Sequence, residues 1–343
     1  MSRGEGKARS PIDPGDVRRG PVRIDRRALI GAGLALAATG ARAAAPVVRV
    51  DDPRLEAVLE PRQTLRTLYR GGRWCEGPCW LPHRAGLAFS DVKRNHILLL
   101  TRAGEVETLV APSNNANGNT LDARGRLITC EHRGRRVVRR DPDGAVTVLA
   151  DSFAGKPLNA PNDAVLGPDG AIWFTDPVYG IAEPEEGIQA EPEQRARRVY
   201  RIPEPGRVEA MTAAVDQPNG LAFAPDGKTL YVAESGAARN PEGGRAILAF
   251  PVEADRLGAP RVFAALEAGV PDGLKVDLDG RVYAACIDGV RIFDPAGVLL
   301  GRVATPTTAA NLAFGGPDDR TLFITAGSAV HAIELRAPAL RRF

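Results

Sequence analysis

One pattern of polar and apolar positions recurs along the 343-residue chain. Each copy has a polar residue, a short apolar run, a turn of Pro, Asp and Gly, and a second apolar run rich in β-forming residues. The fullest copy is PNGLAFAPDGKTLYVAES, Pro218 to Ser235. Copies recur every 40 to 57 residues, roughly, which is the spacing of propeller blades. The polar head residues of the copies are Glu76, Asn117, Asn162, Asn219, Asp272 and Asn311.

The runs between these heads predict an all-β chain. The second runs, such as LITCE and IWFTD, read as buried strands, and no segment shows sustained helical periodicity. The segment TLRTLYR, Thr64 to Arg70, stands before the first head, where every other copy has an outer strand. We therefore expect residues 46–343 to form one six-bladed β-propeller with four-stranded blades, in which this N-terminal strand closes the last blade.

Residues 1–45 have the pattern of an export signal. Arg26 and Arg27 precede a weakly apolar run, Ala28 to Ala38, and the small residues Ala41-Arg42-Ala43 follow as a cleavage site requires. An arginine pair in this position indicates a twin-arginine-type signal that is removed on export, which predicts a periplasmic or otherwise exported protein. An ordinary secretory leader or a disordered basic tail are the alternatives.

Charge and hydropathy argue against two classes of binding partner, nucleic acids and membranes. A formal net charge of +3 with few aromatic residues argues against nucleic-acid binding, and the run Ala28 to Ala38 is too short for stable membrane insertion. Nothing in the sequence specifies an oligomeric state.

Four cysteines are too few for a disulfide framework in a chain of this length. Cys75 and Cys79 bracket a Gly-Pro pair, and an extended chain would hold them too far apart to pair unless Gly-Pro makes a turn.

The heads point to a metal site. A propeller directs the starts of its innermost strands to one mouth of the central channel, so the six heads should converge there. They are all oxygen donors, without His or Cys, and such sets suit a hard divalent cation such as calcium or magnesium. Glu76 and Asp272 would balance its charge. Taken singly, an Asn before Gly is an ordinary turn residue, but a structural repeat gives no reason for acids at only two of the heads.

Several long motifs also carry a family resemblance. The chain is similar to the gluconolactonase, senescence marker protein and luciferin-regenerating enzyme family, above all to its bacterial gluconolactonases, over nearly all of Arg73 to Ala326. The matching stretches include EGPCW, SNNANGNTLDARGRLITCEHRGRRV, LNAPNDAVLGPDGAIWFTDPVYGI, PNGLAFAPDGKTLYVAES and PDGLKVDLDGRVYAA.

The resemblance implies a six-bladed propeller that holds one divalent cation, usually calcium, with magnesium, manganese or zinc as alternatives. The family's metal ligands match Glu76, Asn162, Asn219 and Asp272. Asn162 also matches a substrate-contacting position, and we add the neighbouring polar residues of the same motifs as further expected substrate contacts. These are Asn117, His132 and Tyr179.

The expected reaction is metal-dependent hydrolysis of a sugar lactone, glucono-1,5-lactone or a close aldonolactone, to the aldonic acid. Asp272 is the candidate base for the attacking water, and a hydroxide on the cation is the alternative. Two long loops, Pro177 to Arg198 and Gly236 to Arg245, are either functional covers or mobile insertions, and their place after the second strands allows them to cover the mouth of the channel. The other functions that this sequence allows are hydrolysis of another lactone or a phosphotriester at the same site, and a binding propeller without turnover.

Overall fold

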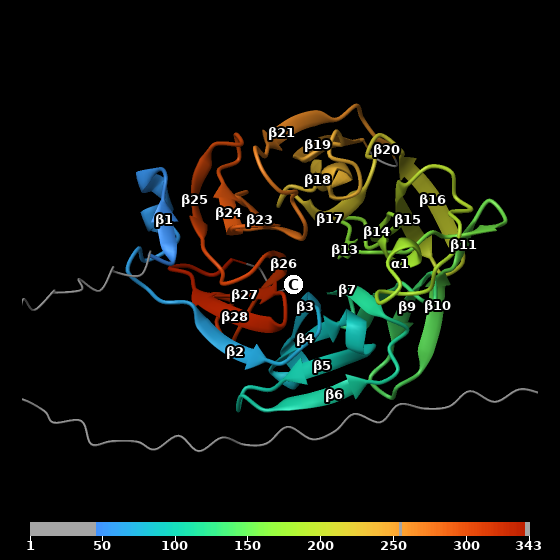
Figure 1. The fold of residues 1–343 in the computed structure, drawn as a ribbon, viewed down its shortest axis with the longest axis horizontal. Coiled ribbons are helices and arrows are strands. Elements are labelled where there is room, and N and C mark those ends of the chain that lie inside the picture. Colours follow the sequence, from blue (N-terminus) through green and yellow to red (C-terminus); the bar gives the residue numbers. More distant parts are fainter. Residues whose placement is uncertain (1–45, 254–255, 340–343) are drawn as a thin grey trace, which may run out of the picture. The chain divides into compact units, whose positions relative to one another are not determined.

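The computed structural model describes residues 46–253 and 256–339, so the predicted export signal in residues 1–45 lies outside the described residues. Within the described part, antiparallel sheets form six blades arranged around a central axis (Figure 1). The prediction of an all-β, six-bladed propeller is therefore confirmed. No helix in the described residues is long and apolar enough to cross a membrane.

Each blade is a sheet in which strands that follow one another in the chain pair as neighbours. Blade one contains β3 (Cys75–Leu81), β4 (Gly86–Asp91), β5 (His96–Leu100) and β6 (Val106–Val110), and blade two contains β7 (Ala116–Leu121), β8 (Leu127–Glu131), β9 (Arg136–Arg140) and β10 (Val146–Ala150). Blade three contains β13 (Ala164–Leu166), β14 (Ile172–Asp176), β15 (Arg198–Glu204) and β16 (Arg207–Thr212), and blade four contains β17 (Pro218–Phe223), β18 (Thr229–Glu234), β19 (Ala246–Glu253) and β21 (Arg261–Ala265). Blade five contains β22 (Leu274–Val276), β23 (Val282–Cys286), β24 (Gly289–Phe293) and β25 (Leu299–Val303), and blade six contains β26 (Ala309–Gly315), β27 (Thr321–Ala326), β28 (Ala329–Glu334) and β2 (Arg66–Arg70).

Several shorter elements lie outside the four-stranded sheets of the blades. A two-stranded ribbon of β11 (Ser152–Phe153) and β12 (Lys156–Pro157) follows blade two, and β20 (Arg256–Leu257) pairs with the end of β19. The described residues contain one short α-helix, α1 (Tyr179–Ala182), in agreement with the absence of helical periodicity. The 3₁₀ turns are η1 (Pro53–Ala57), η2 (Pro82–Arg84), η3 (Val92–Arg94) and η4 (Gly236–Ala238).

The N-terminal part of the described chain closes the ring. β2 pairs antiparallel with β28, with Arg66 opposite Ala332, so the predicted closing strand is confirmed. The structure adds a strand that the repeat pattern does not predict. β1 (Val48–Val50) pairs with β25 and gives blade five a fifth strand. Both strands cover edges that would otherwise present unpaired backbone groups.

The residue after most heads is glycine because neighbouring innermost strands touch through their backbones. The amide of Gly118 donates to the carbonyl of Asn162 at 2.8 Å, and the amide of Gly220 donates to the carbonyl of Asp272 at 3.1 Å. A Cβ on Gly118 would lie 2.5 Å from the carbonyl oxygen of Asn162, and one on Gly220 would lie 2.3 Å from that of Asp272. These glycines therefore join one blade to another and bring their head residues together.

The hydrophobic core lies between the blades. Tyr283 of blade five and Phe314 of blade six, for example, meet edge to face with 5.0 Å between ring centroids. The second strands are buried along their whole length, as LFITA in β27 and VYAAC in β23 illustrate. Because the second strand of each blade packs against both neighbouring blades, its residues read as continuous apolar runs in the sequence.

Candidate functional site

The predicted site residues meet at one mouth of the central channel. A cavity of about 200 Å³ lies there, at the starts of the innermost strands of blades one to five. Of the seven residues predicted for metal, substrate or catalysis, all but His132 line this cavity. The six are Glu76, Asn117, Asn162, Tyr179, Asn219 and Asp272.

Two of these side chains are carboxylates: Glu76 is buried and Asp272 is half-buried. Glu76 is 4% exposed, and its Oε2 accepts a hydrogen bond from the amide of Gly77 at 2.9 Å. Burial, together with the charge of the neighbouring Asp163, raises the pKa of Glu76 to about 8. Burial also holds the pKa of Asp272 well above its ordinary value, and the charges of Glu76 and Asp163 add to that effect. Without a counter-charge the pair resists ionisation, so the cavity favours a bound cation.

The carboxamides connect the blades across the cavity. Nδ2 of Asn162 donates to Oδ1 of Asn219 at 2.7 Å. Oδ1 of Asn117 is buried and has no hydrogen-bond partner in the described structure. The phenol of Tyr179, from α1, lies 3.5 Å from the carbonyl oxygen of Ser235. Asn117 thus brings an unsatisfied acceptor to the wall of the cavity, and such a buried atom is costly unless a ligand or water satisfies it.

The donor set fits a hard divalent cation. Among the described residues, no three His, Cys, Asp or Glu side chains gather as a metal-binding cluster. The candidate ligands are instead two carboxylates, Glu76 and Asp272, and two carboxamides, Asn162 and Asn219. Calcium accepts such mixed oxygen sets, and two carboxylates match its charge.

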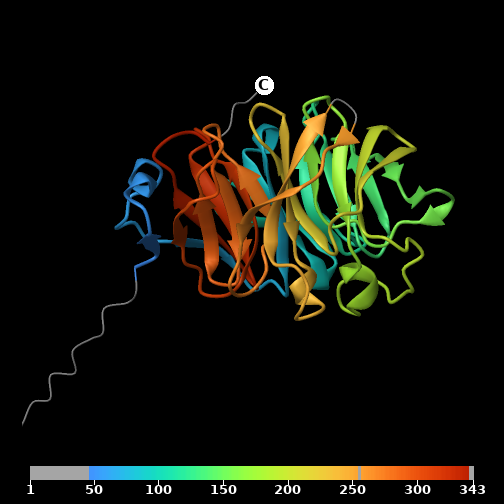
Figure 2. The same cartoon turned by 90° about the horizontal axis from the view of Figure 1, so that it is seen from above.

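Both long loops supply residues to the wall of this cavity, which favours a cover over a detached insertion. Pro177 to Arg198 supplies Glu183 and Glu186 to its wall, and Gly236 to Arg245 supplies Arg239. Figure 2 shows α1 of the first loop and the short η4 turn of the second projecting from the same face of the propeller.

Ion pairs hold the first loop over the mouth. On the side of blade one, Arg73 pairs with Glu185 at 2.7 Å, and Lys93 lies 3.7 Å from Glu186. On the side of blade four, Arg239 pairs with Glu183. The acidic run Glu183–Glu186 thus spans the mouth between two blades.

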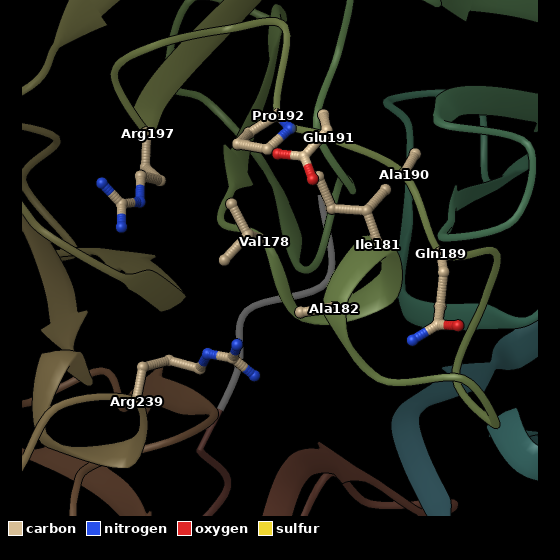
Figure 3. Close-up of a pocket in the computed structure, with 9 residues that line it drawn as sticks. All are labelled: Val178, Ile181, Ala182, Gln189, Ala190, Glu191, Pro192, Arg197 and Arg239. Carbon is tan, nitrogen blue, oxygen red and sulfur yellow. The ribbon is translucent and has the colours of Figure 1, made fainter.

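A second and larger pocket of about 620 Å³ adjoins the covered cavity on the other side of α1. Its wall includes Ile181 and Ala182 of that helix, and Arg239 belongs to both pockets. Figure 3 shows Arg197 and Arg239 on one side of this pocket and Gln189 on the other.

His132 has a different place from the one expected. It is fully buried and does not line the cavity. Its Nε2 lies 3.2 Å from Oδ1 of Asn162, and its Nδ1 lies 3.1 Å from the carbonyl oxygen of Glu186. The imidazole therefore touches the site through Asn162 and is screened from a substrate in the cavity.

The sequence analysis missed several residues of the site. Asp163 is a buried acid, and it accepts a hydrogen bond from Nδ2 of Asn311 at 3.3 Å. Its signal was its position directly after a head, in Pro-Asn-Asp, where the other copies have Gly or an apolar residue. Trp74, Glu186 and Arg239 line the cavity without any repeated motif to mark them.

The cysteines take no part in the site. All four are free thiols and all four are buried, so Cys75 and Cys79 do not pair. The β3–β4 register shifts between Glu76 and Cys79, but this irregularity does not bring the two sulfur atoms together. The sequence left open whether Cys75 and Cys79 form a disulfide, and the structure shows that they do not.

Comparison with known proteins adds a family. Residues 74–328 match the SMP-30/Gluconolactonase/LRE-like region. A gluconolactonase of Zymomonas mobilis is 30% identical over 298 residues, which cover 80% of this chain and 82% of that protein. A pentonolactonase of Haloferax volcanii is 27% identical over 259 residues, covering 73% of this chain and 80% of that one. The solved structure of a gluconolactonase from Xanthomonas campestris superposes with a TM-score of 0.79 at 38% identity, over 84% of this chain and 95% of that one.

Proposed function

The chain belongs to the SMP-30/gluconolactonase/LRE-like family, and on that premise we propose that it hydrolyses a sugar lactone, glucono-1,5-lactone or a close aldonolactone, to the aldonic acid. The observation that carries this proposal is that two carboxylates, the buried Glu76 and the half-buried Asp272, line one cavity together with carboxamides. Relatives that bear the names gluconolactonase and pentonolactonase support the choice of a lactone.

The cavity suits a small polar substrate. Its volume of about 200 Å³ is below the range of about 300 to 1,000 Å³ that drug-sized ligands occupy, so it favours a single sugar ring. Sugar hydroxyls both donate and accept hydrogen bonds, and the unpartnered Oδ1 of Asn117 can accept from one of them. Tyr179, whose pKa burial raises, remains a neutral phenol that can donate to another.

We infer that Glu76, Asn162, Asn219 and Asp272 hold a divalent cation, with calcium the best match to four oxygen donors. When bound, such a cation supplies Lewis-acid polarisation of the lactone carbonyl and keeps both carboxylates ionised.

Asp272 is the proposed base. Its carboxylate accepts a proton from the attacking water while the water oxygen bonds to the lactone carbonyl carbon. The bond between that carbon and the ring oxygen then breaks, and the proton passes to the departing ring oxygen. One water is consumed and the open hydroxy acid is released. The loops over the mouth limit solvent access to the cavity during these steps.

A direct test measures proton release after glucono-1,5-lactone is added to the purified protein. We expect a rate well above spontaneous ring opening, loss of that rate with EDTA, and recovery with calcium. Glu76→Gln should abolish the chelator-sensitive rate, and Glu267→Gln, at an exposed position outside the cavity, should retain it. A wild-type rate equal to spontaneous opening would remove the lactonase proposal. A fast rate that EDTA does not lower would refute only the proposed role of a cation.

We also propose export as the cellular context, on the sequence of residues 1–45 alone. The test is N-terminal sequencing of the protein from the periplasm of an expressing bacterium. Cleavage near Ala44 that depends on Arg26 and Arg27 would support the twin-arginine route, and an uncleaved cytoplasmic chain would contradict it.

A further inference from the structure

The orientation of the His132 ring is fixed by the elements around it. His132 follows directly after β8 and is fully buried. A Cβ added to Gly180 of α1 would lie 2.4 Å from Cγ of His132, so the helix backbone packs directly on the ring. On the other side, Nε2 faces the carboxamide of Asn162. The imidazole is thus held between α1 and a proposed metal ligand and cannot turn freely.

The partner of Nδ1 decides where the proton of the neutral ring resides. Nδ1 lies 3.1 Å from the backbone carbonyl oxygen of Glu186, an atom that only accepts hydrogen bonds. A neutral imidazole carries one proton, so that proton is on Nδ1. The ring is fully buried and faces only a backbone carbonyl and a carboxamide through its two nitrogens, so no counter-charge accompanies it and the neutral form is favoured. Nε2 then presents a lone pair to Asn162.

This lone pair constrains the Asn162 carboxamide. With Oδ1 of Asn162 towards Nε2, two acceptors face each other at 3.2 Å. A half-turn of the carboxamide replaces that contact with a hydrogen bond from Nδ2 to Nε2. The same half-turn sends Oδ1 of Asn162 to the side of Asn219.

Asn219 already presents an oxygen on that side. Its side chain hydrogen-bonds the carboxylate of Asp272, and its Oδ1 faces Asn162. After the half-turn, two carboxamide oxygens are neighbours, and this arrangement is favourable only when a positive charge lies beside both. The hydrogen bonding of His132 and the demand of a cation for oxygen ligands thus select the same orientation of Asn162.

We propose that His132 is a positioning residue that accepts a hydrogen bond from Asn162 and thereby turns the oxygen of Asn162 towards the cation, an inference that rests on the proposed function. His132 contacts neither the cation nor the substrate. Its role is to remove the choice between the two amide orientations before the cation binds, as outer-shell groups of metal sites do.

Nitrogen NMR of the full-length chain labelled with ¹⁵N-histidine tests the tautomer directly. We expect the His132 ring to carry its proton on Nδ1 and none on Nε2, with and without calcium, and its signals are assigned by their loss in His132→Gln. An Nε2–H tautomer or a doubly protonated ring would overturn the proposal. The tautomer is read on the wild-type chain, and the readout does not depend on activity.

Calcium titration calorimetry on two variants tests the consequence. His132→Phe keeps a ring but has no acceptor, and we expect its calcium affinity to fall about 10- to 100-fold. His132→Gln restores an acceptor near the Nε2 position, and its affinity should return to within about threefold of wild type. Equal affinity in wild type and His132→Phe, with matching melting temperatures, would contradict the proposal.

The two proposals fail in different ways. A wild-type chain that binds no calcium at all refutes the proposed cation and with it the positioning role. A chain that binds calcium but has its His132 proton on Nε2 leaves the proposed lactonase intact and refutes the positioning role alone.

Discussion

Nη1 of Arg239 lies 2.5 Å from Oε1 of Glu183, and this ion pair joins the two long loops over the cavity. The side chains are 36% and 50% exposed, so water screens the pair and its contribution to the stability of the fold is small. Its position matters more than its energy. Arg239 lines both the cavity and the larger pocket beyond α1, so its side chain lies at the boundary between them.

We predict that Arg239→Ala raises KM for the lactone by about threefold to fivefold, with little change in kcat, because the cover loosens while the ligands below it stay in place. Steady-state kinetics in low salt measures both constants. Arg207→Ala, which removes an exposed ion-paired arginine on the outer strand of blade three, serves as the matched control and should leave KM unchanged. A fall in kcat with an unaltered KM would show that Arg239 acts on the chemistry itself.

Asp272→Asn should lower the rate by at least about 100-fold if this carboxylate is the base. The substitution also removes one of two neighbouring acids that oppose each other's ionisation, so the metal-free variant should unfold no more easily than wild type. Kinetics and thermal unfolding in EDTA check the two expectations, with the exposed Glu267→Gln as control. A variant that keeps more than about a tenth of the rate rules out Asp272 as the base.

The stability of the chain should depend on pH through Asp176. This fully buried carboxyl accepts the backbone amides of Asn159 and Ala160 at 2.9 and 2.8 Å, and burial raises its pKa from 3.8 to about 7. Because the folded pKa exceeds the unfolded one, the stabilisation from this group is complete below pH 3.8 and is lost as the pH rises through about 7.

Urea unfolding at pH 5 and pH 8, without metal, tests this dependence on Asp176. The free energy of unfolding of Asp176→Asn should fall less between the two pH values than that of wild type, by about 1 to 3 kcal/mol. Asp143→Asn, at an exposed turn, controls for a general loss of charge and should follow wild type. Parallel pH profiles for wild type and Asp176→Asn would show that Asp176 is ionised in the fold at both pH values.

The four thiols should be unreactive in the native protein. Burial raises the pKa of Cys75, Cys79 and Cys286 to about 12 and that of Cys130 well above its ordinary value, so none is a thiolate near neutral pH. Reaction with a thiol reagent such as DTNB should release nothing from the native chain and four equivalents in guanidinium chloride without reductant. Recovery of only two equivalents after unfolding would reveal a disulfide.

The local sequence pattern and its repetition determined the fold class, the number of blades and the grouping of the head residues. The alternation of short apolar runs with Pro, Asp and Gly turns is a property of each hairpin alone, and its recurrence sets the number of blades. The closing role of β2 followed from its place before the first head. The choice of Glu76, Asn117, Asn162, Asn219 and Asp272 as one group followed too, because equivalent positions of a propeller meet at one mouth.

Tertiary contacts decided the rest, because they join side chains from different blades and from loops that carry no repeat. Only the packing of Gly180 on His132 reveals that this histidine lies behind Asn162, and only the fold places Asp163 beside Glu76. The pairing of Glu183 with Arg239 depends on where two irregular loops come to rest. The head of each repeat could be read from the sequence, but which atom of that head faces a cation depends on what lies behind it.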